Sequence, residues 1–374
     1  MSEPIVQMRR RPTRQIRVGR VLIGGGAPIS VQSMTNTDTR DVAATIAQIE
    51  ALLAAGCEII RLAVPDMEAA KVLHEIRLRT YAPLIADIHF NHVLALEALA
   101  AGVDGLRLNP GNIGSADRVK QVVHAAGERG VSIRIGVNGG SLEKDLLAQY
   151  GGSPCPEAMA ESAMRHVAIL ESLDFRDIKI SLKATDVRTT VEAYRLLAMK
   201  VDYPFHIGIT EAGTKFTGSI KSSVGLGILL YDGIGDTLRV SLTDDPVEEV
   251  RAGFEILKAL HLRRRGPTLI ACPTCGRDEL DVIALAKQVE AAIGHVSAPI
   301  KIAVMGCVVN GPGEATQADL GIAGGGRGVS LLYRKGKMIR KVDDRSRLLQ
   351  AIVEEVEKMA AEEPDEAGTA ADPS

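Results

Sequence analysis

The chain has 374 residues, of which 46% are hydrophobic, and its formal net charge at pH 7 is -3. This composition is typical of a globular protein with a large core, and the near-neutral charge argues against a general attraction to nucleic acid or anionic membranes. Tryptophan is absent and no stretch resembles a signal peptide or a membrane span. Five cysteines, an odd number in a chain this long, argue against a disulfide framework, so we expect a cytoplasmic protein.

The predicted elements begin with a hairpin or barrel cap over residues 1–28, followed by eight short strands over residues 29–262. A helical pattern follows each strand, as in DVAATIAQIEALLAA, where Asp41 is suited to the N-cap. Eight such units match an α/β fold of the (β/α)8 TIM-barrel type, with a doubly wound parallel sheet as the alternative. The strands are predicted in ISVQSM, EIIRLAV, PLIADIH, GLRLNP, SIRIGVN, IKISLK, FHIGIT and TLRVSL.

The pattern changes after residue 262. Residues 263–267 are predicted to be a linker, and residues 268–360 a second, small α/β domain. In that domain TLIACP and IKIAVMG are predicted strands, and GVSLLYRKGKMIRKVD is a predicted hairpin that turns at residues 334–337. Residues 361–374 are rich in Ala, Glu and Pro, which predicts a disordered tail.

The carboxyl ends of the predicted barrel strands carry many cations. Barrel active sites lie at these ends, but only Asp87 and Glu211 are obvious acids among them. Because cations without counter-charges are costly to bury, the imbalance predicts an anionic ligand, and the planar fork of arginine favours a diphosphate. The cations are Arg61, Arg107, Arg134, Lys183 and Arg239, and the polar residues at these ends are Gln32, His89, Asn109, Asn138, Thr210 and Ser241.

Three cysteines lie at predicted strand ends of the small domain. Cys272 and Cys275 form a Cys-x-x-Cys motif, and Cys307 follows the next predicted strand in MGCVVNGPGEA. Zinc would need a fourth ligand, and His295 is the only nearby histidine, whereas an iron–sulfur cluster accepts three thiolates with a different fourth ligand such as Glu314. Spacing alone leaves an iron–sulfur cluster, a zinc site and a redox-active dithiol open.

Ten motifs, in order along residues 10–340, resemble the bacterial 4-hydroxy-3-methylbut-2-enyl diphosphate synthase family of isoprenoid biosynthesis. The resemblance implies a [4Fe-4S] cluster held by Cys272, Cys275, Cys307 and Glu314. A carboxylate on an otherwise soft site should be the easiest ligand to displace, which implies a catalytic role for Glu314. The motifs are VQSMTNTDT, IIRLAVPD, IADIHF, LRLNPGNIG, IRIGVNGGSL, SLKATDV, HIGITEAG, DTLRVSLT, ACPTCGR and MGCVVNGPGEA.

The resemblance also implies the substrate, 2-C-methyl-D-erythritol 2,4-cyclodiphosphate, which the family opens by two-electron reduction with loss of water. Glu211 resembles the family's candidate acid for the departing hydroxyl, although it can also be interpreted as a carboxylate that neutralises nearby cations. The residues implied in phosphate binding are Arg61, Arg107, Arg134, Lys183, Arg239 and Ser241, and those implied to line the pocket are His89, Asn109, Asn138 and Thr210.

The family further implies reduced flavodoxin or ferredoxin as the electron donor. It also implies a homodimer in which the cluster domain of one subunit caps the barrel of the other. Two other interpretations remain: a zinc-containing barrel lyase or hydrolase of a sugar phosphate, and a non-enzymatic binding module with a zinc-held C-terminal domain.

Overall fold

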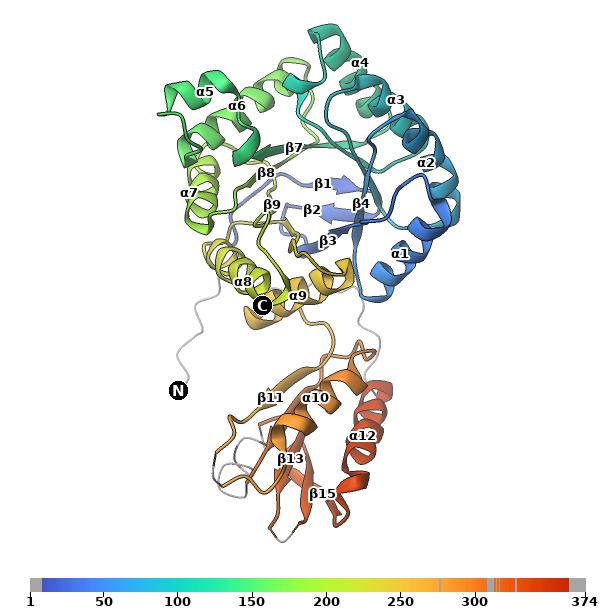
Figure 1. The fold of residues 1–374 in the computed structure, drawn as a ribbon, viewed down its shortest axis with the longest axis vertical. Helices are drawn as coiled ribbons and strands as arrows, with labels where there is room; N and C mark the ends of the chain where they lie inside the picture. The colour runs from blue at the N-terminus through green and yellow to red at the C-terminus, as the bar shows by residue number, and fades with distance from the viewer. Residues whose placement is uncertain are drawn as a thin grey trace. The chain divides into compact units, whose positions relative to one another are not determined.

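The computed structural model describes residues 9–275, 277–307, 313, 315, 317–326 and 328–362. The chain forms two compact units that divide between Arg263 and Arg264, at the start of the predicted linker 263–267 (Figure 1). In the predicted disordered tail, Ala361 and Glu362 belong to the last helix, and residues 363–374 lie outside the described residues. No helix in the described ranges is long and apolar enough to cross a membrane.

The first unit is a barrel of eight parallel strands in the order β8-β7-β6-β5-β4-β3-β10-β9. A parallel bridge between Ile180 and Phe205 joins the two ends of this order, so the sheet closes. The predicted TIM barrel is therefore confirmed, and the doubly wound alternative is wrong. The strands are β3 (Ser30–Met34), β4 (Ile59–Ala63), β5 (Leu84–Asp87), β6 (Gly105–Arg107), β7 (Ser132–Asn138), β8 (Ile178–Lys183), β9 (His206–Ile207) and β10 (Thr237–Leu238).

Helices surround the barrel (Figure 1). Aspartates cap several of them: Asp41, as predicted, accepts a hydrogen bond of 3.0 Å from the backbone N–H of Ala44, and Asp186 accepts one of 2.7 Å from Thr189. A short extra helix, α5 (Lys144–Gln149), lies in the long connection after β7. The others are α1 (Val42–Ala54), α2 (Met67–Arg79), α3 (His92–Ala100), α4 (Ala116–Glu128), α6 (Pro156–Ser172), α7 (Val187–Ala198), α8 (Lys215–Tyr231) and α9 (Pro246–Ala259), with 3-10 turns at Pro110–Asn112 and Gly139–Ser141.

Side chains along each barrel strand point alternately to the apolar core beneath the helices and to the lumen of the barrel. In β7, Ile133 and Ile135 belong to the apolar core between strands and helices, whereas Arg134 faces the lumen and contacts Ser181 of β8. The same period of two places Ile60 and Leu62 of β4 and the apolar residues of β8 on the helix side, and the basic residues of both strands inside the barrel. Barrel interiors are usually filled with branched apolar side chains, so this charged lumen marks a binding site.

A hairpin closes the amino-terminal end of the barrel. Strands β1 (Ile16–Val18) and β2 (Val21–Ile23) pair antiparallel, and their apolar residues form one cluster with Ile59 and Ile85 from the beginnings of β4 and β5. The predicted hairpin cap over residues 1–28 agrees with this element where the chain is described; residues 1–8 lie outside the described residues. Ligands therefore reach the lumen from the opposite, carboxyl end.

The second unit has a five-stranded sheet in the order β11-β12-β13-β14-β15. The first three strands are parallel and the last two form the predicted hairpin, in which Lys335 and Gly336 adopt positive φ at the turn. Apolar residues of the sheet and of the helices described in this unit share one core. The elements are β11 (Thr268–Ala271), α10 (Val282–Ile293), β12 (Lys301–Met305), β13 (Leu320–Gly324), β14 (Ser330–Arg334), β15 (Lys337–Val342), a 3-10 turn (Arg345–Arg347) and α12 (Leu348–Glu362).

Candidate active site

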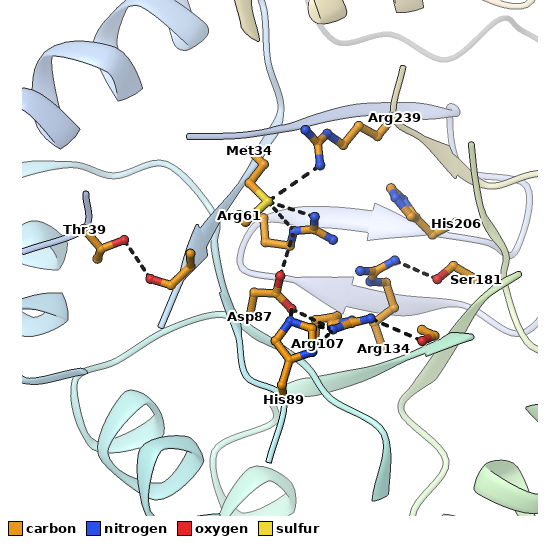
Figure 2. A network of polar contacts seen from close by, with 12 residues as sticks. Met34, Thr39, Arg61, Asp87, His89, Arg107, Arg134, Ser181, His206 and Arg239 are labelled. Carbon is orange, nitrogen blue, oxygen red and sulfur yellow. Dashed lines mark hydrogen bonds and ion pairs between the residues drawn. The ribbon is translucent and has the colours of Figure 1, made fainter. Parts of the chain in front are cut away.

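The predicted cations of the barrel lie together in the lumen, and Figure 2 shows the four arginines among them. Arg134 is 2% exposed and Lys183 is 6% exposed, so both are out of bulk water. Burial, together with the neighbouring cations, lowers the pKa of Arg134 and of Lys183 well below the ordinary values. These groups lose favourable hydration on burial, and the nearby carboxylates do not supply enough negative charge to compensate. An anion that enters the lumen would supply the missing negative charge.

Asp87 at the end of β5 is the central carboxylate of the lumen. Its Oδ1 lies 3.3 Å from Nη1 of Arg107, and its Oδ2 lies 3.6 Å from Nε of Arg61. Although burial acts to raise the pKa of Asp87, the combined field of Arg61, Arg107 and Arg134 lowers it, so the group is ionised. Burial lowers the pKa of Arg61 to about 10, which still leaves it charged at neutral pH. One carboxylate is thus shared among several guanidinium groups.

His89 contacts Arg107 directly, and Asn109 binds the backbone of Gly136, which lies against Arg107. The two ring nitrogens of His89 lie 2.9 and 3.1 Å from Nη1 of Arg107, and because arginine only donates, the histidine accepts in its neutral form. Burial, followed by the field of the neighbouring guanidinium groups, lowers the pKa of His89, which agrees with a neutral ring. Asn109 exchanges two hydrogen bonds with the backbone of Gly136, of 2.8 and 3.1 Å. A side chain at Gly136 would collide with Arg107, since a Cβ there would lie 2.7 Å from Nε.

Arg239, just beyond β10, is oriented by a carboxylate from a helix. Its Nε and Nη2 donate to the two carboxylate oxygens of Glu249 on α9, at 3.0 and 3.1 Å. Glu249 is buried and also accepts hydrogen bonds from Ser33 and from the backbone of Leu242. This two-point contact leaves Nη1 of Arg239 directed to the sulfur of Met34, 3.6 Å away (Figure 2).

Lys183 has a histidine partner that the sequence interpretation missed. Its Nζ lies 3.3 Å from Nε2 of His206, a fully buried residue of β9. Burial and the adjacent Lys183 lower the pKa of His206 well below its ordinary value, so the ring is neutral and accepts from the lysine. Lys179, four residues before Lys183 on the same strand, is also fully buried, and its Nζ has no hydrogen-bond partner in the described part of the chain. Lys179, Ser181 and Lys183 alternate along β8 and therefore point to the same side of the strand. This alternation was the sequence signal that could have identified Lys179 as a lumen residue.

The remaining predicted residues of the barrel lie at or near its rim. Asn138, Thr210 and Ser241 are half-buried at the ends of β7, β9 and β10, and Gln32 is instead buried within β3, with its amide atoms unpaired among the described residues. Glu211 is exposed and adopts a φ of 51°, a left-handed conformation that is strained for a residue with a side chain. Its carboxylate forms no ion pair with a cation of the described ranges, which disfavours the interpretation that it only neutralises neighbours.

In the second unit, the three cysteines at strand ends line one pocket of about 180 Å³. Cys272 follows β11 and Cys307 follows β12, and these strands are parallel neighbours, so their carboxyl ends meet. The backbone N–H of Gly306 donates to Sγ of Cys272 at 3.3 Å. A hydrogen bond with Cys275 raises the pKa of Arg277, which also lines the pocket.

The three cysteine sulfurs of this pocket are donors of the type that holds an iron–sulfur cluster. His295, the fourth ligand considered for zinc, does not line the pocket and lies 3.9 Å from Glu357 of α12. Glu314 lies outside the described residues.

Comparison with known proteins matches both units. The GcpE TIM-barrel domain matches residues 13–254, and the GcpE protein C-terminal domain matches residues 268–358. A protein of Geobacter sulfurreducens named 4-hydroxy-3-methylbut-2-en-1-yl diphosphate synthase (flavodoxin) is 63% identical over 94% of this chain and 98% of its own length. A protein of the same name from Lawsonia intracellularis is 59% identical over the same shares. Among solved structures, dihydropteroate synthase of Xanthomonas albilineans covers 66% of this chain and 98% of its own, at 15% identity and a TM-score of 0.47.

Proposed function

This chain belongs to the GcpE family, and on that premise we propose that it converts 2-C-methyl-D-erythritol 2,4-cyclodiphosphate to 4-hydroxy-3-methylbut-2-enyl diphosphate. The reaction is a two-electron reductive ring opening with loss of water. The observation that carries the proposal is the excess of buried cations over carboxylates in the barrel lumen, because a cyclic diphosphate supplies the missing negative charge. The names of the relatives that match nearly the whole chain support the same reaction.

The lumen residues have distinct proposed roles toward this substrate. Arg107, Arg134 and Lys183 bind phosphate oxygens from inside the barrel, with Arg61 and Arg239 acting from the side of β3, β4 and β10. Gly208 permits this arrangement, since a Cβ there would lie 2.7 Å from Nζ of Lys183. The residues proposed to complete the pocket are Ser241, which donates to phosphate, and His89, Asn109, Asn138 and Thr210, which line it.

We propose that Cys272, Cys275 and Cys307 hold a [4Fe-4S] cluster with Glu314 as the fourth, exchangeable ligand. Support comes from the common pocket of the three cysteines and from the hydrogen bonds that Gly306 and Arg277 make with Cys272 and Cys275. When bound, the cluster would supply the electrons for the reduction. We further propose that Glu211, exposed at the end of β9, delivers the proton that the departing hydroxyl needs.

Reduced flavodoxin is the proposed electron donor, with ferredoxin as the alternative, because the matched relatives carry flavodoxin in their names. We also propose a homodimer in the cytoplasm, in which the second unit of one subunit caps the barrel of its partner. Helix α8 offers an apolar face for such pairing, since exposed apolar residues recur along it at helical spacing. They are Phe216, Ile220, Val224, Ile228 and Tyr231, with exposed fractions of 76%, 49%, 50%, 38% and 70%.

The decisive experiment is metal and sulfide analysis of anaerobically purified protein, followed by spectroscopy with and without the cyclodiphosphate. Iron with equivalent acid-labile sulfide, and a spectrum that changes on adding the cyclodiphosphate, is the expected result. Zinc without sulfide would instead favour the barrel lyase or hydrolase of a sugar phosphate. A Glu314→Cys variant should keep its iron and sulfide but lose turnover, and a fully active variant would argue against ligand exchange at this position.

A further inference from the structure

Met34 ends β3 at the mouth side of the lumen, between two of the arginines. It pairs in register with Arg61 on β4. Its sulfur accepts hydrogen bonds from Nε and Nη2 of Arg61, at 3.1 and 2.8 Å, and lies 3.6 Å from Nη1 of Arg239 (Figure 2). One thioether therefore contacts guanidinium groups from two strands that lie on either side of β3.

Each of these arginines also has a carboxylate partner. Arg61 has Asp87 at 3.6 Å from its Nε, and Arg239 has its Nε and Nη2 occupied by Glu249. Met34 adds a second contact to Nε and a contact to Nη2 of Arg61, and it contacts Nη1 of Arg239, the nitrogen that Glu249 leaves available. The methionine is only half-buried, and it belongs to none of the apolar clusters found among the described residues, so packing does not account for it.

A thioether differs in one respect from the acceptors that usually hold an arginine. Sulfur is a weak and uncharged acceptor, so it restrains the direction of the donors without cancelling their positive charge. A carboxylate at this position would neutralise the arginines and compete with an incoming anion. A purely aliphatic side chain would leave the two guanidinium groups free to move apart or to rotate.

We propose that Met34 is a positioning residue for anion binding, which orients Arg61 and Arg239 toward one anionic ligand while leaving both fully charged. The proposed function enters this inference only through the identity of the anion. Pre-organised donors bind more tightly because less side-chain freedom is lost on binding.

The test compares substitutions at residue 34 in the full-length protein, using calorimetric titration with inorganic pyrophosphate and with the cyclodiphosphate. Met34→Leu keeps the volume but removes the acceptor, and we expect about tenfold weaker binding of both anions. Met34→Gln keeps a neutral acceptor, and its affinity should stay within about twofold of the wild type. Met34→Glu should weaken binding more than Met34→Leu does, because it adds a competing charge.

Two further measurements separate positioning from general damage. Met199→Leu, at an exposed methionine, is the matched control and should bind like the wild type. Thermal unfolding should be the same for the wild type and for the leucine and glutamine variants. The inference is overturned if Met34→Leu binds pyrophosphate as tightly as the wild type, or if Met34→Gln loses as much affinity as Met34→Leu.

The same titrations distinguish this inference from the proposed function. If the wild type binds pyrophosphate with the expected order of variants but does not bind the cyclodiphosphate, the proposed substrate is wrong and the role of Met34 stands. If the wild type binds the cyclodiphosphate and all variants bind alike, the role of Met34 is wrong and the proposed substrate stands. A wild type that binds neither anion overturns both.

Discussion

The barrel lumen and the cysteine pocket both collect reactive side chains at the ends of parallel strands, but they hold them differently. In the lumen, Asp87 and Glu249 orient the arginines through ion pairs, and the cations come from strands spread around the barrel. In the pocket, the cysteines come from the ends of two neighbouring strands, and Cys275 is exposed. The comparison indicates that the protein's own ion pairs arrange the cations of the lumen, whereas the proposed cluster would complete the arrangement of the cysteines.

The largest effect is expected from Cys272→Ser. If the two sites are built independently, this variant should lose the iron chromophore and all turnover, yet bind pyrophosphate within about twofold of the wild type. Iron content, visible absorbance and calorimetry provide the measurements. Cys155→Ser is the control, because serine is a good N-cap and Cys155 caps α6 by accepting from Ala158. Loss of pyrophosphate binding in Cys272→Ser would contradict the independence of the two sites.

The complementary change is Arg107→Ala in the lumen. Removing a buried donor to a charged ligand costs about 1.5–3 kcal/mol, so the cyclodiphosphate should bind about ten- to a hundredfold more weakly. Iron and sulfide content should not change. Arg251→Ala, an exposed arginine of α9, should leave the affinity unaltered. Unchanged affinity in Arg107→Ala would exclude this residue from the anion site.

A smaller effect, on stability, is expected from Lys179→Met. The lysine is fully buried without a partner among the described residues, so a similar apolar side chain should stabilise the barrel by about 1 kcal/mol. Burial lowers the pKa of Lys179, which means that between the lowered and the ordinary value only the unfolded chain binds the proton. Wild-type stability then rises with pH, and the advantage of the variant should shrink toward the ordinary lysine pKa.

Denaturant unfolding of the two proteins across this pH range measures the difference. Lys200→Met, at an exposed position just after α7, controls for the substitution itself. An advantage that stays constant over the whole range would show that packing, rather than the cost of burying an ammonium group, is responsible.

The smallest expected effects are losses of stability on replacing one helix N-cap residue in each unit. Asp186 caps α7 in the barrel, and Asp281 caps α10 in the second unit through a 3.0 Å hydrogen bond from Ala284. Replacing either with alanine should cost about 1 kcal/mol. Because the chain divides into two compact units, each change should shift only the calorimetric transition of its own unit. A shared shift would show that the units unfold together.

The sequence was sufficient for the elements that depend on local pattern. Short β-rich runs, each followed by a helical pattern, predicted all the barrel strands, and the turn residues Lys335 and Gly336 marked the hairpin of the second unit. The approach of Cys272 to Cys307 also followed from sequence, because both end predicted strands of one small sheet. The roles of these cysteines and of the rim residues remain predictions.

Other parts of the site depended on contacts between distant segments. Glu249 lies on a helix, and its contact with Arg239 required the packing of α9 against the barrel. His206 and Met34 carry no sequence signal as neighbours of Lys183 or Arg61, because only barrel closure and strand register bring them together. Sequence by itself thus determined the strands and the cations at their carboxyl ends. Tertiary structure decided which of those residues touch, since pair distances depend on register and closure that no local pattern encodes.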